Sequence, residues 1–206
     1  MSIDPVQNMT AIRTVRLFPL SETMLYPGVV QPLHIFESRY CEMIEDALAD
    51  NRLITMATLV PGYDDQEYFG RPPLERPVCL GKIAMHEQSE DGTHNFLLAG
   101  VSRAYILEEL PPLKSYREAN VAIIDELDDV PEHEASEIRD ELLQQLLKRT
   151  DEVRVIGDSL QGEEIPLPRL LDALAFALPL SREEKLELAS EASVRQRLKQ
   201  ISSALL

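Results

Sequence analysis

The sequence predicts an α+β protein in which a β-rich module, residues 12–127, is followed by a helical subdomain, residues 128–206. Up to about Glu126 the apolar residues mostly alternate and are interrupted by Pro and Gly, a pattern typical of strands. Beyond Asp129 they recur every three or four residues, which is typical of amphipathic helices. With 44% hydrophobic and 27% charged residues, the 206-residue chain has the composition of a folded protein.

The strand-like segments of the first module are short and separated by turn residues. Pro19 ends the first segment, and Pro32 favours an extended conformation over residues 31–35, because proline lacks the amide hydrogen that a helix interior uses. The dipeptide Asp91-Gly92 predicts a two-residue hairpin turn. The predicted strands are residues 14–18, 31–35, 53–60, 78–86, 93–98, 105–107 and 120–124.

A two-residue turn at Asp91-Gly92 also fixes the register of the predicted hairpin. It places Ser89 opposite His94, so that His86 and His94 point to opposite faces. A zinc ion needs three or four converging ligands. We therefore expect no metal site at this histidine pair.

One helix, residues 37–50, interrupts the predicted strands, and four helical segments make up the second part of the chain. The first of these four follows Asp129 and ends near Arg149, and the second covers residues 169–178. A capping box, Ser181 with Glu184, begins the third. The predicted buried face of the helix over residues 37–50 contains Phe36, Tyr40, Met43, Ile44, Ala47 and Leu48. The last helix is expected to bury Val194, Leu198, Ile201 and Leu205.

The chain is strongly acidic along its whole length. It has 36 acidic and 20 basic residues, a formal net charge of −16, and a pI near 4.6. Binding to a phosphate backbone depends on clustered Lys and Arg, and a field of this sign opposes it. A general nucleic-acid-binding protein is therefore disfavoured.

The sequence gives no sign of membrane insertion or secretion. No apolar run approaches the roughly 18 residues needed to cross a bilayer, and the first residues lack the basic and apolar regions of a signal peptide. We expect a cytoplasmic protein in which Cys41 and Cys79 are reduced thiols.

No catalytic centre emerges from the residues. The segment Gly157-Asp158-Ser159-Leu160 resembles the nucleophile block of an esterase and lipase family, but that chemistry needs a histidine base downstream, and the last histidine here is His133. No phosphate-binding loop of the type Gly-x-x-x-x-Gly-Lys-Ser/Thr occurs. We expect no catalytic residue, no cofactor and no metal.

Several motifs, in the same order, resemble the N-terminal substrate-recognition domain of Lon proteases, from about residue 13 to the end of the chain. The resemblance implies a PUA-like β-rich pseudo-barrel followed by helices. It does not extend to the ATPase and protease domains of that family, so the sequence is read as a free-standing domain. The matching motifs are Leu17-Phe18-Pro19-Leu20, Tyr26-Pro27-Gly28, Pro32 to Tyr40, Gly81-Lys82-Ile83-Ala84, Leu97 to Arg103, and Tyr116 to Val121.

Within these motifs a set of residues is expected to specify the fold rather than to contact a ligand. Phe36 and Tyr40, one helical turn apart, should anchor the helix on the sheet. Glu37 and Arg39 are neighbours on the predicted helix and should not face each other. Either could instead cap a helix terminus or reach a strand, and Arg103 could neutralise such an acid. Ala104 stands where the family usually has an aromatic residue after its arginine. The fold-specifying residues are Pro27, Gly28, His34, Phe36, Glu37, Arg39, Tyr40, Gly100 and Arg103.

The resemblance implies a non-enzymatic module that binds unfolded or partner polypeptides, together with a separate protease or chaperone. Peptide binding needs exposed apolar anchors or an open strand edge. The candidate anchors are Tyr63, Tyr68 and Phe69, in a long segment rich in Pro, Gly and acidic residues.

Two alternative functions remain open at this point. The first is a PUA-like nucleic-acid-binding module, for which the last twelve residues offer Arg195, Arg197 and Lys199 without an acid. The second is a serine hydrolase that uses Ser159 within the Gly157-Asp158-Ser159-Leu160 segment.

Overall fold

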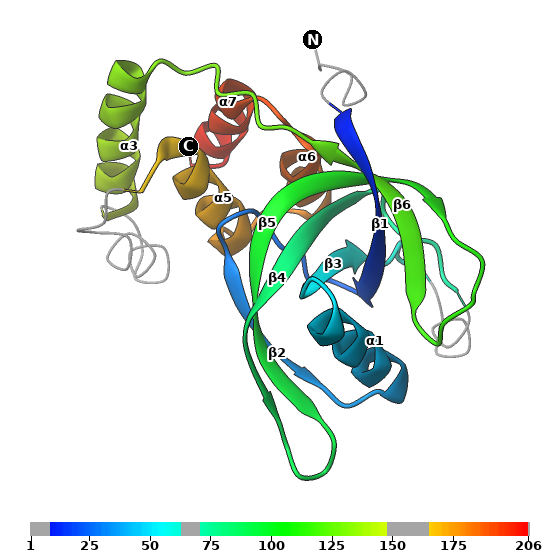
Figure 1. Cartoon of the computed structure of the whole chain (residues 1–206). Helices are drawn as coiled ribbons and strands as arrows, with labels where there is room; N and C mark the ends of the chain where they lie inside the picture. The colour runs from blue at the N-terminus through cyan, green and yellow to red at the C-terminus, as the bar shows by residue number, and fades with distance from the viewer. Residues whose placement is uncertain (1–8, 63–70, 148–164, 206) are drawn as a thin grey trace. The chain divides into compact units, whose positions relative to one another are not determined.

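The computed structural model describes residues 9–62, 71–147 and 165–205. The chain divides into two compact units, residues 1–125 and 126–206. In these described residues the first unit holds six strands and one helix, and the second holds helices, as expected for an α+β fold (Figure 1). None of the helices in the described ranges is both long and apolar enough to cross a membrane.

The strands of the first unit form a mixed sheet that closes on itself as a ring. In the order β2-β5-β4-β3-β1-β6 each strand is bonded to the next, and β5 also pairs with β6. The β1–β3 pair is parallel, and the other pairs are antiparallel. Five strands therefore close the ring, and β2 lies outside it. The strands are β1 (Met9–Leu20), β2 (Val30–Ile35), β3 (Leu53–Thr58), β4 (Pro77–Gln88), β5 (His94–Glu109) and β6 (Arg117–Ile124).

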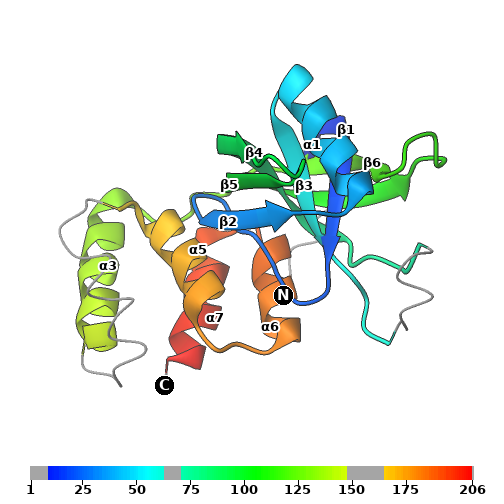
Figure 2. The same cartoon turned by 90° about the horizontal axis from the view of Figure 1, so that it is seen from below.

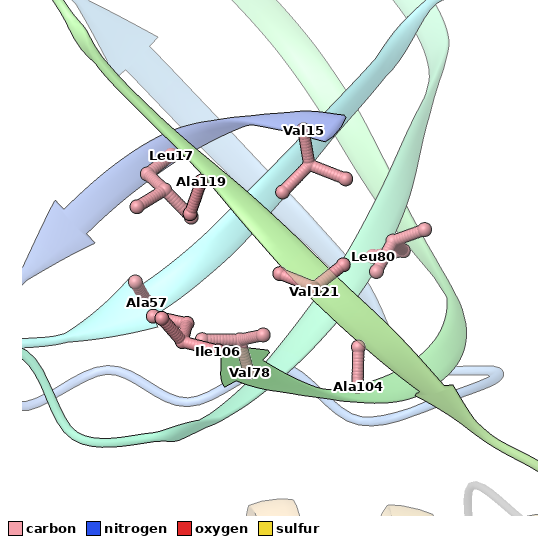
Figure 3. Packing of buried hydrophobic residues seen from close by; sticks show 9 residues of the cluster. All are labelled: Val15, Leu17, Ala57, Val78, Leu80, Ala104, Ile106, Ala119 and Val121. Atoms are coloured by element: carbon pink, nitrogen blue, oxygen red, sulfur yellow. The ribbon is translucent and has the colours of Figure 1, made fainter. Parts of the chain in front are cut away.

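Apolar side chains fill the interior of this ring. Alternate residues of a strand point to opposite faces, and the inward residues of five strands meet as one buried cluster (Figure 3). Small residues, among them Ala104 and Ala119, let opposite walls approach. The cluster contains Val15, Leu17, Ala57, Val78, Leu80, Ala104, Ile106, Ala119 and Val121.

Helix α1 (Ser38–Ala49) packs against β1 and β3. Its buried residues include Tyr40, whose ring meets Phe18 edge to face with 4.9 Å between centroids. The expected role of Phe36 is wrong, because the helix begins at Ser38 and the Phe36 side chain is 70% exposed. Phe36 precedes the N-cap residue, so helical spacing does not apply to it.

Two further expectations about the strands require correction. Residues 93–98 and 105–107 belong to a single strand, β5, which changes partner along its length. It pairs with β2 from His94 to Ala99 and with β6 from Ala104 onwards. The hairpin loop between β4 and β5 has three residues, Glu90 to Gly92, because the Ser89 amide bonds to the Thr93 carbonyl. Gly92, at φ +84°, occupies the left-handed position of this common loop type.

The change of partner in β5 occurs at Gly100, where another stretch of main chain lies against the strand. Gly28, at φ +82°, donates its amide to the Gly100 carbonyl, and the Gly100 amide donates to the Val29 carbonyl at 2.8 Å. A Cβ atom at Gly100 would overlap the Tyr26 carbonyl oxygen. Only glycine can occupy this position without moving the main chain.

The second unit contains α3 (Glu132–Leu147), α5 (Leu167–Ala177), α6 (Arg182–Ser190) and α7 (Val194–Ala204) (Figure 2). Helix α5 contacts the other three. The predicted capping box at the start of α6 is confirmed, since Ser181 and Glu184 bond to each other's main-chain amides. Helix α5 begins earlier than the predicted residue 169: Pro168 lies in its first turn, where the missing amide hydrogen costs nothing.

A buried ion pair lies inside this helical unit. The Arg197 and Asp172 side chains are each 1% exposed, and Arg197 Nη1 lies 2.5 Å from Asp172 Oδ1. Arg197 Nη2 also lies 2.6 Å from Glu126 Oε2. Arg197 thus connects α7 both to α5, through Asp172, and to the segment that precedes the helices, through Glu126. Removing one partner of such a pair would leave a buried charge uncompensated.

We expect Gly100→Ala to lower the free energy of unfolding by roughly 3 kcal/mol or more, because the new methyl group must displace the main chain at Tyr26. Gly92→Ala is the matched control: nothing lies within 4 Å of its Cβ position, and only its positive φ is penalised, by about 1–2 kcal/mol. Denaturant unfolding followed by circular dichroism measures both. Equal losses of unfolding free energy in the two variants would show that the close approach of the main chain at Gly100 does not determine the cost of the substitution.

Candidate functional site

The β2 strand has an open main-chain edge, since β5 is its single partner among the described strands. Because the Val29 carbonyl accepts a hydrogen bond from Gly100, the odd-numbered residues of β2 direct their main-chain groups toward β5. Val30, Pro32 and His34 therefore direct theirs toward the open edge. Pro32 has no amide hydrogen to donate, and its nitrogen faces the open edge. This is the usual position of a proline in an edge strand.

Next to this edge, β2 and the adjoining halves of β5 and β4 form a three-stranded ribbon. In Figure 1 the β4–β5 hairpin, with β2 beside it, extends beyond the ring. Residues in one row share a face, and Pro32, Leu97 and Met85 form such a row. A shallow groove of about 620 Å³ lies here. It is lined by Pro32, Leu33, His34, Met85, His86, Glu87, Asn95, Phe96 and Leu97.

This outer surface is unusually apolar for an exposed one. Phe36 is 70% exposed, Met85 65% and Val30 52%. The Phe36 ring lies beside that of His34, with 6.1 Å between centroids. We call the surface the outer ribbon face and define it as Val30, Pro32, Phe36, Met85 and Leu97. Clusters of exposed large apolar side chains mark interaction sites more often than isolated ones do.

A polar row crosses the ribbon beside these apolar residues. His34 and Asn95 are paired in the sheet, and His34 Nδ1 lies 2.8 Å from Asn95 Oδ1. Since an amide oxygen can only accept, the Nδ1 atom carries the hydrogen. Glu87 ends the row on β4 and is the single acidic side chain among the described residues that line the groove.

The inward face of the ribbon contains a histidine pair that we did not expect. The three-residue loop shifts the hairpin register by one residue, so that His94 lies opposite Gln88 and shares a face with His86. His86 Nε2 and His94 Nδ1 are 2.8 Å apart, and His94 is buried. The expectation that the two histidines point to opposite faces is therefore wrong.

The direction of the hydrogen bond within this pair follows from burial. The other ring nitrogen of His94, Nε2, is buried without a hydrogen-bond partner in the described part of the chain. An unpaired lone pair there costs less than an unpaired N–H. We therefore assign the hydrogen of this contact to His94 Nδ1, which donates it to His86 Nε2. Within residues 9–62, 71–147 and 165–205 no three metal-ligating side chains converge, so this pair has no third ligand.

The resemblance motifs lie mainly around the crossing at Gly100 and the start of α1. Glu37 and Arg39 form an ion pair with a shortest distance of 2.8 Å, so the expectation that they do not face each other is wrong. Glu37 is the N-cap residue with an extended backbone, and the Arg39 side chain turns back toward its carboxylate. The Arg39 guanidinium also lies over the Tyr40 ring at 4.6 Å. Arg103 is buried in β5, opposite Cys79.

Other sequence candidates fall in different places. Tyr63, Tyr68 and Phe69 lie outside the described residues, as does the Gly157-Asp158-Ser159-Leu160 segment. Of the three basic side chains predicted near the C-terminus, Lys199 is exposed and the other two are engaged in ion pairs. Arg197 is buried with Asp172, and Arg195 is paired with Glu134 at 3.1 Å.

Comparisons with known proteins agree with the fold. Residues 14–206 match the family profile described as the ATP-dependent protease La (LON) substrate-binding domain. The chain is 27% identical to the Lon protease of Brevibacillus choshinensis, with 90% of this chain and 24% of that protein covered. It is 25% identical to Lon protease 1 of Bacillus subtilis, with 92% and 24% covered. The chain thus spans about a quarter of the length of these relatives.

Two solved structures share the fold. One is a Lon N-terminal domain protein from Xanthomonas campestris, with a TM-score of 0.66 and 21% identity over 93% of this chain and 98% of that one. The other is the N-terminal domain of the Mycobacterium avium complex Lon protease, with a TM-score of 0.64 and 20% identity over 94% and 98%.

We expect the β-rich unit to lose stability as the pH falls below about 6.5, the ordinary pKa of histidine. Burial, followed by the nearby His94 and Arg52, lowers the pKa of His86. The unfolded chain therefore takes up a proton that the folded chain resists. The free energy of unfolding decreases until the pH reaches the lowered pKa. Denaturant unfolding at about pH 7.5 and pH 5.5 measures this decrease.

The substitution His86→Gln should reduce the pH dependence, because glutamine stays neutral and can still accept from His94. His133→Gln, at an exposed position in the helical unit, should leave it unchanged. A parent protein equally stable at both pH values would contradict the prediction.

Proposed function

Because the chain belongs to the family of Lon substrate-binding domains, we propose that it binds unfolded or partner polypeptides through the outer ribbon face. In this proposal it is a non-enzymatic module. Its 206 residues contain no Gly-x-x-x-x-Gly-Lys-Ser/Thr loop, and Ser159 has no histidine downstream. No cofactor or metal is required for binding of this kind.

The exposure of the outer ribbon face is the observation that supports this proposal. Apolar side chains of this size lower the free energy by leaving water, at about 25 cal/mol for each Å² buried. Phe36 and Met85 are mostly exposed. Both stand only a few residues from buried parts of the chain, since Phe36 precedes α1 and Met85 follows Leu80 of the buried cluster. A polypeptide whose own apolar residues are exposed can cover these side chains. Unfolded chains expose apolar residues in this way.

The partners follow from the same reasoning. The relatives carry the name Lon protease, so we propose that a polypeptide held by this chain is passed to a separate protease or chaperone. Nucleic acid is disfavoured by the net charge of −16. The ion pairs of Arg195 and Arg197 further reduce the number of cations available to phosphate.

The segment with Tyr63, Tyr68 and Phe69 is a second candidate for the polypeptide-binding surface. Three aromatic rings stand there among acidic residues, and aromatic side chains are frequent binding hot spots. Replacing all three with Ala should weaken polypeptide binding if this segment contributes, with folding mostly unchanged.

We expect the double substitution Phe36→Ser with Met85→Ser to weaken the binding of an unfolded polypeptide about thirtyfold. Each truncation removes an apolar contact of the order of 1 kcal/mol, while exposed positions change stability little. Fluorescence anisotropy with labelled, reduced and alkylated lysozyme measures the affinity. The matched control is Leu113→Ser, which alters an apolar side chain that is 88% exposed in the loop between β5 and β6.

The outcomes separate the two surfaces. If the ribbon variant binds like the parent and the triple alanine variant at positions 63, 68 and 69 does not, the outer ribbon face is the wrong surface. If the parent protein binds no unfolded polypeptide, the proposed function itself is wrong.

A further inference from the structure

Resting on the proposed function, we propose how the polypeptide is held: an extended, basic and apolar segment of it adds to the open edge of β2 as a further strand. Main-chain hydrogen bonds to an edge strand give affinity, and alternate side chains give selectivity. Pairing of this kind selects polypeptides by conformation and charge, whereas apolar contact alone would not.

The main chain of β2 is suited to such pairing. Val30 and His34 each direct an amide and a carbonyl to the open edge, and Pro32 directs a carbonyl alone. This follows because the main-chain groups of successive residues in a strand point alternately to its two sides, and those of the odd-numbered residues point to β5. All three residues are exposed. An added antiparallel or parallel strand can therefore find two donors and three acceptors along β2.

The ribbon has one other unpaired edge in the described residues, the end of β4, and it is less suitable. The β4–β5 register is interrupted by an irregularity between Ile83 and Met85, beside that edge. Bulges bend a strand and discourage further pairing. The Ile83 carbonyl there already accepts a hydrogen bond from Arg52 Nε at 3.0 Å. The β2 edge has a continuous register over all six residues.

The side chains next to the β2 edge specify what the added strand should carry. Residues directly opposite one another on neighbouring strands have Cβ atoms about 5 Å apart. Every second side chain of the added strand would therefore meet Val30, Pro32 or His34 and extend the apolar outer ribbon face. Apolar residues at alternate positions of the segment are the best match.

Charge favours a basic segment over a second copy of this chain. Glu87, Glu90 and Asp91 stand at the hairpin end of the ribbon, and none of them forms an ion pair with another described residue. The groove contains no lysine or arginine among its described lining residues. A second copy would bring another net charge of −16, whereas Lys or Arg flanking an apolar segment would be attracted.

The missing donor at Pro32 supplies a sharp test. We expect Pro32→Ala to tighten the binding of the peptide Arg-Val-Thr-Val-Thr-Val-Arg roughly three- to tenfold, because it adds one hydrogen-bond donor to the edge. Pro112→Ala, a change at another exposed proline of the same unit, is the control and should have no effect. Affinity is measured by isothermal titration, and circular dichroism checks that each variant is folded.

Peptide chemistry tests the main-chain pairing directly. Two versions of this peptide are N-methylated at alternate residues, one version at odd and the other at even positions, with side chains unchanged. In a strand only one of these sets faces β2. We expect one version to bind at least tenfold more weakly than the parent peptide and the other to bind nearly as well.

Each result decides a separate point. If both methylated peptides bind like the parent peptide and Pro32→Ala has no effect, strand addition is wrong while binding of polypeptides remains. If Glu in place of both Arg residues leaves the affinity unchanged, the basic preference is wrong. If the protein alone sediments as a dimer that Phe36→Ser dissociates, a second copy occupies the edge. If the protein binds neither the peptide nor alkylated lysozyme, the proposed function itself is wrong.

Discussion

The close approach of two main-chain segments at Gly100 is the constraint on which the rest of the β-rich unit depends. On one side of Gly100, β5 pairs with β2, and beyond Arg103 it pairs with β6. The turn with Gly28 fits between these two regions because Gly100 has no side chain. This arrangement allows five strands to close into a ring while β2 remains outside it, and the open edge of β2 is its direct result.

The sequence predicted the type of most elements correctly, and the errors have local causes. Alternating residues indicated the strands, and apolar spacing of three and four indicated Tyr40, Met43 and Ile44 as the buried face of α1. The hairpin register was wrong because Asp91-Gly92 fits both a two-residue turn and the end of a three-residue loop. A difference of one residue reverses the face of every side chain, which is why the contact between His86 and His94 was missed.

The outer ribbon face was harder to predict than the fold. Phe36 and Met85 have the composition of core residues, and only the path of the chain shows that they are exposed. The spacing of Phe36 and Tyr40 matched a helix, but the helix starts between them. One signal was present: a proline inside a predicted strand indicates an edge. Pro32 therefore could have located the open side of the sheet, whereas nothing in the sequence placed Met85 beside it.

The ion pair of Arg197 has a consequence for how this protein can be divided or recombined. Glu126 is the second residue after the end of β6, yet its carboxylate forms an ion pair with Arg197 of the helical unit. Leu127 also pairs with Ser193, and Asp129 accepts the Arg195 amide at 2.8 Å. A gene fragment for the helices that started after residue 129 would lack Glu126. Of the two acidic partners Glu126 and Asp172, Arg197 would then keep Asp172. A fusion or exchange of units should therefore be cut just before Glu126, so that this short segment is inherited together with α7.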